Sequence, residues 1–146
     1  MPYLACCIND SNPILKCSEN RMEFSVINKQ RNSIRLITVD GCLIQKNKNK
    51  CDYLYEFYTP VNNADDIITK AIYVELKGTD LDHAVHQIKE TISHCNQRHI
   101  NAKKEAFIVC SRVPKAGTAV QILKKKLMAS SNSLLQIQTR QHKYIV

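Results

Sequence analysis

Apolar and polar residues alternate along several short segments of the chain, as they do in β-strands that bury one face. In the clearest segment, residues 70–78, Val74 and Leu76 lie on one face of the expected strand, and the other face ends with Glu75 and Lys77. Charged side chains on a buried strand are costly unless they are partnered or bind a metal. This conflict between apolar pattern and charge marks a candidate functional site. The alternative is an ion pair at the surface of an edge strand.

The remaining pattern predicts a strand-rich chain. Further strands are expected at 22–27, 34–44, 51–59, 105–113 and 134–146. Residues 9–13 form a turn cluster, with a short strand or helix expected on either side of it. Residues 28–33 are expected to form a polar hairpin connection, and residues 60–69 a loop between two antiparallel strands.

Two segments show the spacing of amphipathic helices. From Leu81 to Cys95, apolar residues recur every three or four positions, and Thr79 can cap this helix. A second helix is expected from Gly117, with Leu123 facing the core and three lysines outside. Strands joined through helices are usually parallel.

The predicted fold class is therefore α/β (α+β), with a mixed central β-sheet flanked by helices. We expect one domain over residues 1–146, because the length suits a single core. Residues 1–30 are expected to be an N-terminal extension or edge elements, and residues 31–146 the core.

The most informative feature of the composition is its charge. The 21 Lys and Arg residues outnumber the 13 Asp and Glu residues, which gives a net charge of +8. This favours a polyanionic partner, with nucleic acid first and an anionic membrane surface second. No apolar run approaches the roughly 18 residues of a membrane span, and the N-terminus lacks the pattern of a signal peptide. A cytoplasmic protein without membrane attachment is expected.

The chain contains seven cysteines, and none are spaced as C-x-x-C. This spacing does not predict a zinc site or a thioredoxin-like motif. The simplest interpretation is small buried side chains in a reducing compartment, with metal binding or a reactive thiol as the alternatives.

Candidate chemistry gathers where two strands are expected to pair. If residues 51–59 pair antiparallel with residues 70–78, Asp52 comes close to Glu75 and Lys77. Carboxylate oxygens are the ligands that Mg²⁺ prefers, and it commonly takes one or two of them in addition to phosphate and water. A lysine beside them can orient the attacking water or stabilise charge at phosphorus. Asp40, beside Gly41, is either part of a turn or a further acid near this site.

Basic residues near these strands are candidates for phosphate binding. Lys46, Lys48 and Lys50 alternate with asparagines in the segment before Asp52, although a solvated turn would show the same pattern. Arg112 and Lys115 follow a buried strand and precede a helix, an arrangement that can hold a phosphate.

Asp52 followed by Glu75-Leu76-Lys77 resembles the Asp…(Asp/Glu)-x-Lys signature of the PD-(D/E)XK nuclease superfamily, with its restriction-endonuclease-like core. The resemblance implies that Asp52, Glu75 and the Leu76 carbonyl bind Mg²⁺ or Mn²⁺ and that Lys77 assists the attacking water. It also implies a site-facing glutamine on the following helix, which Gln87 matches by position.

The segment from about Ile34 to Val113 resembles the β-β-β-α-β portion of that family. Cys51 stands where the signature has proline, and no first core helix with an inward acid is evident. Glu19 and Glu23 are the only candidates for that acid.

These observations predict a metal-dependent nuclease acting on nucleic acid, with DNA favoured and a homodimer possible. The alternatives are an inactive nuclease-fold module that binds nucleic acid or assists assembly, and a protein-interaction subunit.

Overall fold

The computed structural model describes residues 2–62, 65–76, 80–112 and 117–146. The strands of a large sheet are β1 (Cys7–Asp10), β4 (Ile34–Thr38), β5 (Tyr53–Thr59), β6 (Ile67–Glu75), β7 (Lys103–Cys110) and β8 (Ser133–Thr139). The strands of a small sheet are β2 (Ile14–Glu19), β3 (Met22–Ile27) and β9 (Gln141–Ile145). The helices are α1 (Pro2–Ala5), α2 (Leu81–His94) and α3 (Gly117–Ser131).

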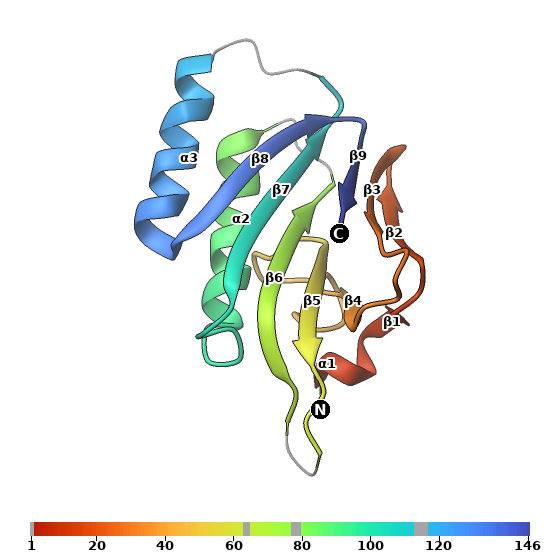
Figure 1. Ribbon diagram of the computed structural model, residues 1–146. Helices are drawn as coiled ribbons and strands as arrows, with labels where there is room; N and C mark the ends of the chain where they lie inside the picture. Colours follow the sequence, from red (N-terminus) through yellow and green to blue (C-terminus); the bar gives the residue numbers. More distant parts are fainter. Residues whose placement is uncertain (1, 63–64, 77–79, 113–116) are drawn as a thin grey trace.

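The large sheet is mixed, with strand order β1-β4-β5-β6-β7-β8 (Figure 1). Strands β4, β5 and β6 pair antiparallel, and β6, β7 and β8 pair parallel. The parallel strands are joined through α2 and α3, as expected when a chain must return to the same end of a sheet. The predicted α+β fold with a mixed sheet flanked by helices is confirmed.

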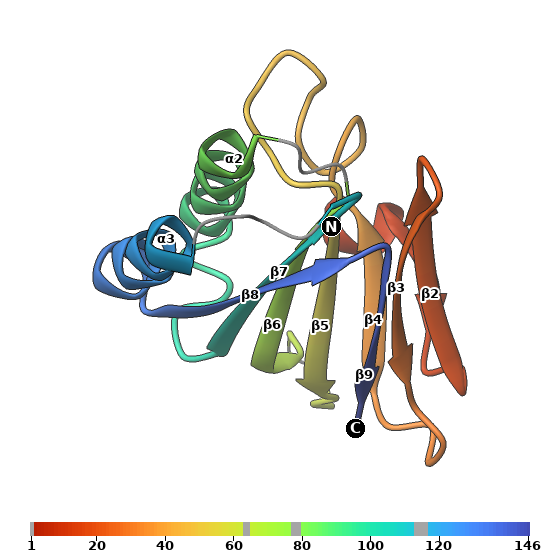
Figure 2. The same cartoon turned by 90° about the horizontal axis from the view of Figure 1, so that it is seen from above.

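The large sheet is buried on both faces (Figure 2). Helices α2 and α3 cover one face, which we call the helix face, and the small sheet packs on the other. Strand β6 contributes to both cores, because Ala71 and Tyr73 lie on the helix face while Ile72, Val74 and Leu76 face the small sheet. The predicted alternation along this strand is therefore confirmed, and each of its faces meets a separate core.

Two connections differ from the prediction. Residues 28–33 do not form a hairpin, because β3 pairs with β2 and β9 whereas β4 pairs with β1 and β5. The C-terminal segment is not one strand either. It turns at Arg140, whose φ is +64°, so that β8 stays in the large sheet and β9 joins the small one.

The start of α2 also differs from the prediction. Asp80 occupies the N-cap position, and its carboxylate accepts a hydrogen bond from the His83 amide. Thr79, the predicted cap, lies outside the described residues. The helix ends at His94 with Cys95 as its C-cap, close to the predicted end. Among the helices that the structure describes, none is long and apolar enough to cross a membrane.

The cysteines follow the sequence-based interpretation only in part. Cys6 and Cys42 form a disulfide, so the expectation of thiols throughout is wrong for this pair. The bond ties the segment before β1 to the segment that follows β4. The other five cysteines are free, and four of them are buried, namely Cys17, Cys51, Cys95 and Cys110.

Alkylation of the unfolded protein tests this pairing. Without reductant, a thiol reagent should modify five cysteines, and after reduction it should modify seven, as read by intact-mass spectrometry. Replacing Cys6 and Cys42 by serine should lower the free energy of unfolding by roughly 2–4 kcal/mol, because the closed loop restricts the unfolded chain. Seven modified cysteines without reductant would contradict the bond.

Candidate functional site

The pairing of β5 with β6 brings the two predicted acidic residues together. Tyr53 lies opposite Val74 in this antiparallel pair, which sets Asp52 opposite Glu75. The Asp52 amide donates to the Val74 carbonyl at 3.1 Å. The Leu76 amide in turn donates to Asp52 Oδ2 at 2.8 Å, so the backbone of β6 holds one oxygen of this carboxylate. The structure therefore juxtaposes Asp52, Glu75 and Leu76 as the sequence predicted.

Both acidic side chains are buried, with 3% of Asp52 and 1% of Glu75 exposed. By strand alternation, Glu75 lies on the same face as Tyr73, which is the helix face. The adjacent Cys51 thiol is close to both acids. Burial is the main reason that its pKa is raised well above the usual value, and the charges of Glu75 and Asp52 raise it further. Cys51 is therefore a protonated structural thiol at this position.

The donor set fits a hard divalent cation held by few protein ligands. Among the described residues, no group of three or more His, Cys, Asp or Glu side chains is placed to share a metal. Two carboxylates and one backbone carbonyl suit Mg²⁺, which keeps much of its water. The set does not suit a structural zinc ion, which takes four thiolate or imidazole ligands.

Helix α2 is anchored beside these carboxylates. Thr91 Oγ1 accepts a hydrogen bond from the Cys51 amide at 2.8 Å and donates to the Gln87 carbonyl at 3.0 Å. The helix segment that carries Gln87 is thus tied to the residue preceding Asp52. The Gln87 side chain is half-buried, and no hydrogen bond between its amide and either carboxylate is present among the described residues. Lys77 lies outside those residues.

The three lysines predicted to bind phosphate have different surroundings. Lys46 and Lys48 are exposed in the loop between β4 and β5, at the end of the sheet that carries Asp52. Lys50 points inward, with only 9% of its side chain exposed. Its ammonium donates to the Lys46 carbonyl and lies 3.5 Å from Asp40 Oδ1. Lys50 and Asp40 therefore stabilise this loop, and the exposed charge comes from the other two lysines.

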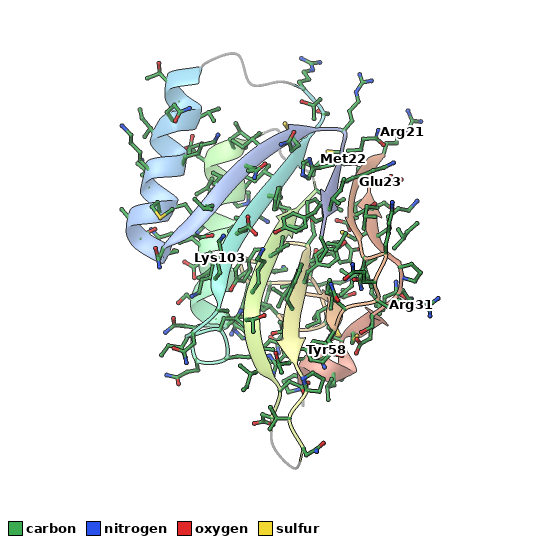
Figure 3. All side chains as sticks on the ribbon, in the orientation of Figure 1. Arg21, Met22, Glu23, Arg31, Tyr58 and Lys103 are labelled. Atoms are coloured by element: carbon green, nitrogen blue, oxygen red, sulfur yellow. A yellow bond between two sulfur atoms is a disulfide. The ribbon has the colours of Figure 1, made fainter. Side chains whose placement is uncertain are left out.

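A cluster of exposed arginines occupies the same end of the sheet, and we call Arg21, Arg112 and Arg140 the arginine end. Because β6 and β7 are parallel, Arg112 follows β7 at the end where Glu75 closes β6. The Arg140 amide donates to the Cys110 carbonyl, and the Arg140 carbonyl accepts from the Glu23 amide, so the three arginine-bearing turns meet. Figure 3 shows Arg21 at this end of the molecule.

Of the arginine end, the sequence predicted only Arg112. Arg21 and Arg140 were missed because β8, β9 and the hairpin of β2 and β3 meet only in the folded chain. Lys115, the other residue predicted near Arg112, lies outside the described residues.

The first core helix that the family resemblance implies is not present among the described residues, and the two candidate acids lie on strands instead. Glu19 ends β2, and Glu23 lies within β3, where it pairs with Lys16 at 3.3 Å. Glu19 and Asp52 both act on the hydroxyl of Tyr53. The pKa of Tyr53 is raised by burial first and then by charges that include those of Glu19 and Asp52.

A second group of buried charges, not predicted from the sequence, lies farther along β5. Glu56 is fully buried on the helix face and accepts two hydrogen bonds from Arg98, from Nε at 2.7 Å and from Nη2 at 2.8 Å. His99 Nε2 lies 2.5 Å from the same carboxylate, and His99 Nδ1 lies 2.7 Å from the Tyr73 hydroxyl. Because Tyr73 stands two residues before Glu75, this network fixes the strand that carries the site.

Arg35 extends this network toward the surface. Its Nη1 lies 3.7 Å from Glu56, and its Nη2 donates to Asp66 at 2.8 Å. The guanidinium also lies 4.0 Å from the centre of the Tyr58 ring, a cation–π contact. Glu56 thus lies between two guanidinium groups. The only sign of this network in the sequence is a carboxylate among the aromatic residues of an expected strand.

The pKa of Glu56 reflects this balance. Burial acts to raise the pKa, but the hydrogen bonds and positive charges of Arg98 and His99 outweigh it, so the pKa is lowered. A lowered pKa in the folded state means that ionised Glu56 stabilises the fold above its unfolded pKa of about 4.3. That stabilisation is lost as the pH falls through the lower folded value.

Replacing Glu56 by glutamine should therefore destabilise the protein by about 3–5 kcal/mol near pH 7, because it leaves buried cations without their carboxylate. Urea unfolding monitored by circular dichroism measures the change. The wild-type protein should lose stability as the pH falls below about 4.3, and the variant should lose less over that interval. Glu90→Gln, at an exposed position on α2, is the control. Equal stability of the two variants would contradict this role for Glu56.

Comparisons with known proteins do not place the chain in a family. Neither a scan against models of known families nor searches of curated proteins and of solved structures finds a match. The function is therefore inferred from the residues and their geometry.

Proposed function

We propose that this protein is a metal-dependent nuclease that hydrolyses phosphodiester bonds of nucleic acid, with DNA as the expected substrate. The observation that carries the proposal is the pair of acids, Asp52 and Glu75, set opposite each other by the pairing of β5 with β6. Both residues are buried at this end of the sheet, and carboxylate oxygens are the ligands that Mg²⁺ prefers.

Asp52, Glu75 and the Leu76 carbonyl would hold Mg²⁺ or Mn²⁺. When bound, such an ion lowers the pKa of a coordinated water and offsets charge on the phosphate. In the chain itself, the Leu76 amide orients the Asp52 carboxylate. We assign to Lys77, next along the chain, the role of orienting the attacking water. We assign to Gln87 the role of supporting the site from α2.

Nucleic acid is the partner that the charge distribution favours. Lys46, Lys48 and the arginine end surround the end of the sheet that carries the carboxylates. Phosphate contacts by such side chains position a nucleic acid without reading its sequence. A cytoplasmic location and a homodimer belong to the same proposal, and sedimentation of the purified protein would test the dimer.

A non-catalytic nucleic-acid-binding module is the second candidate. It is favoured by the near-complete burial of Asp52 and Glu75, which restricts the access of a phosphate to them. The two candidates share the basic surface and differ in whether the carboxylates are needed for a reaction.

Cleavage assays with matched variants separate the two candidates. With Mg²⁺ or Mn²⁺, the wild-type protein should cut DNA, and Glu75→Ala and Lys77→Ala should each lower the rate by at least about 100-fold. Glu90→Ala, an exposed acid on α2, should cut normally. Circular dichroism should show that all variants fold. Absence of cutting by the wild type with any divalent metal, together with binding that survives Glu75→Ala, would favour the binding module instead.

Salt-dependent binding tests the arginine end. Replacing Arg21, Arg112 and Arg140 by glutamine should weaken DNA binding, because fewer side chains then neutralise phosphates. The slope of log K against log salt should become shallower by up to about 0.9 for each phosphate that is no longer neutralised. Fluorescence anisotropy with a labelled duplex, in the Glu75→Ala background without metal, gives the slope.

Arg31→Gln is the matched control, since Arg31 and Arg21 are both exposed arginines with positive φ, of +50° and +67°, and Arg31 lies away from the arginine end (Figure 3). Equal slopes for the control and the triple variant would rule out this surface.

A further inference from the structure

Strand β8 is an open edge of the large sheet. It pairs with β7 in continuous register from Lys104 opposite Ser133 to Cys110 opposite Thr139, and no strand among the described residues pairs with its other side (Figure 1). The Arg140 amide points toward β7, since it donates to the Cys110 carbonyl. Backbone groups alternate in direction along a strand, so those of residues 135, 137 and 139 point outward.

This edge lacks the features that usually prevent a strand from pairing with another chain. Its seven residues, Ser133–Thr139, include no charged residue and no proline, and the pairing with β7 contains no bulge. The opposite edge strand, β1, is different, because it has four residues, carries Asp10 and pairs with a register shift. A long, regular and uncharged edge is a template for an additional strand.

An apolar groove with a basic rim runs beside this edge. It has a volume of about 360 Å³ and lies between α3 and β8. Met128 and Leu134 line it and are 40% and 46% exposed, which is substantial for large apolar side chains. Lys124 and Lys125 lie along the same groove. An occupant would therefore have apolar side chains for the groove and negative charge for the lysines.

We propose that β8 and this groove bind an extended peptide segment of another protein, with an apolar centre and acidic flanks, as an additional strand of the large sheet. The outward amides and carbonyls of β8 would form the backbone hydrogen bonds, and alternate peptide side chains would enter the groove. The lysines select acidic sequences. This surface is separate from the proposed nuclease site and requires neither metal nor Asp52 and Glu75.

A second copy of the chain fits the edge poorly. Two copies paired antiparallel through β8 would bring their α3 helices side by side. The midpoint of α3 is Lys124, within the run Lys124–Lys126, so the two lysine runs would face each other and repel. Nucleic acid is also disfavoured, because its phosphates accept hydrogen bonds but do not donate them, whereas a strand edge offers both donors and acceptors.

A designed peptide tests the proposal. The probe is fluorescein-labelled acetyl-Glu-Glu-Val-Thr-Leu-Thr-Val-Glu-Glu-amide, added to the full chain without metal or nucleic acid. Fluorescence anisotropy should show binding at least about tenfold tighter than that of the same peptide with lysine in place of glutamate. Amide hydrogen exchange followed by NMR should slow at Leu135, Ile137 and Thr139. Methylating the peptide amides along the edge that pairs should abolish binding without any change to the protein.

Protein variants provide matched controls. Leu134→Asp should weaken binding at least about tenfold, whereas Ile145→Asp, at an exposed apolar position on β9, should not. The double change Lys124→Glu and Lys125→Glu should reverse the preference toward the lysine peptide.

Several outcomes would overturn the proposal. They are equal affinity for the acidic, basic and methylated peptides, or unchanged exchange at residues 135, 137 and 139. A dimer that Leu134→Asp dissociates would identify a second copy as the occupant instead. A DNA duplex that slows exchange at the same amides would identify nucleic acid. None of these results depends on whether the protein cuts DNA.

Discussion

The geometry of the site follows from the register between β5 and β6. It sets Asp52 opposite Glu75 and lets the Leu76 amide hold the Asp52 carboxylate. A shift of one residue would move either acid to the opposite face of the sheet. Burial on both faces favours this register, because β6 supplies Tyr73 to one core and Ile72 and Val74 to the other.

The large sheet contains two groups of buried charge, one around Glu56 and one formed by Asp52 and Glu75. Glu56 is surrounded by fixed cations and hydrogen-bond donors, so its charge is balanced within the chain. Asp52 and Glu75 lie at opposite positions of β5 and β6, and the Leu76 amide holds one oxygen of the Asp52 carboxylate. Tyr73 belongs to the Glu56 network through its contact with His99, and it lies two residues before Glu75. The Glu56 network therefore helps to fix the part of β6 that carries the proposed metal site.

Much of this arrangement was predictable from local patterns, and the remainder depends on contacts between distant segments. Period-two alternation identified β6, and the short polar connection after β5 indicated an antiparallel pair, which together predicted the meeting of Asp52 and Glu75. The small sheet was not predictable, because β3 and β9 are far apart in the sequence and pair in parallel. Strands β8 and β9 are separated by a turn at Arg140, which has a positive φ. Positive φ is usually predicted from glycine, so an arginine at this position gives no signal in the sequence. Two partners of Glu56, Arg98 and His99, come from the connection after α2, where no periodicity marks them. The disulfide joins cysteines whose spacing matches no motif.

The proposed peptide edge and the proposed nuclease site can function at the same time because of the sheet's topology. Strands β6, β7 and β8 are parallel, so their carboxyl ends share the end of the sheet that carries Glu75 and the arginine end. A peptide paired along β8 would lie beside the sheet and would leave that end uncovered, with β7 between it and the carboxylates. The two surfaces also attract anions of different kinds, since the arginine end exposes charge alone whereas the groove beside β8 combines lysines with apolar side chains. One basic chain can therefore discriminate between a nucleic acid and an acidic peptide by the apolar contacts that only the peptide can make.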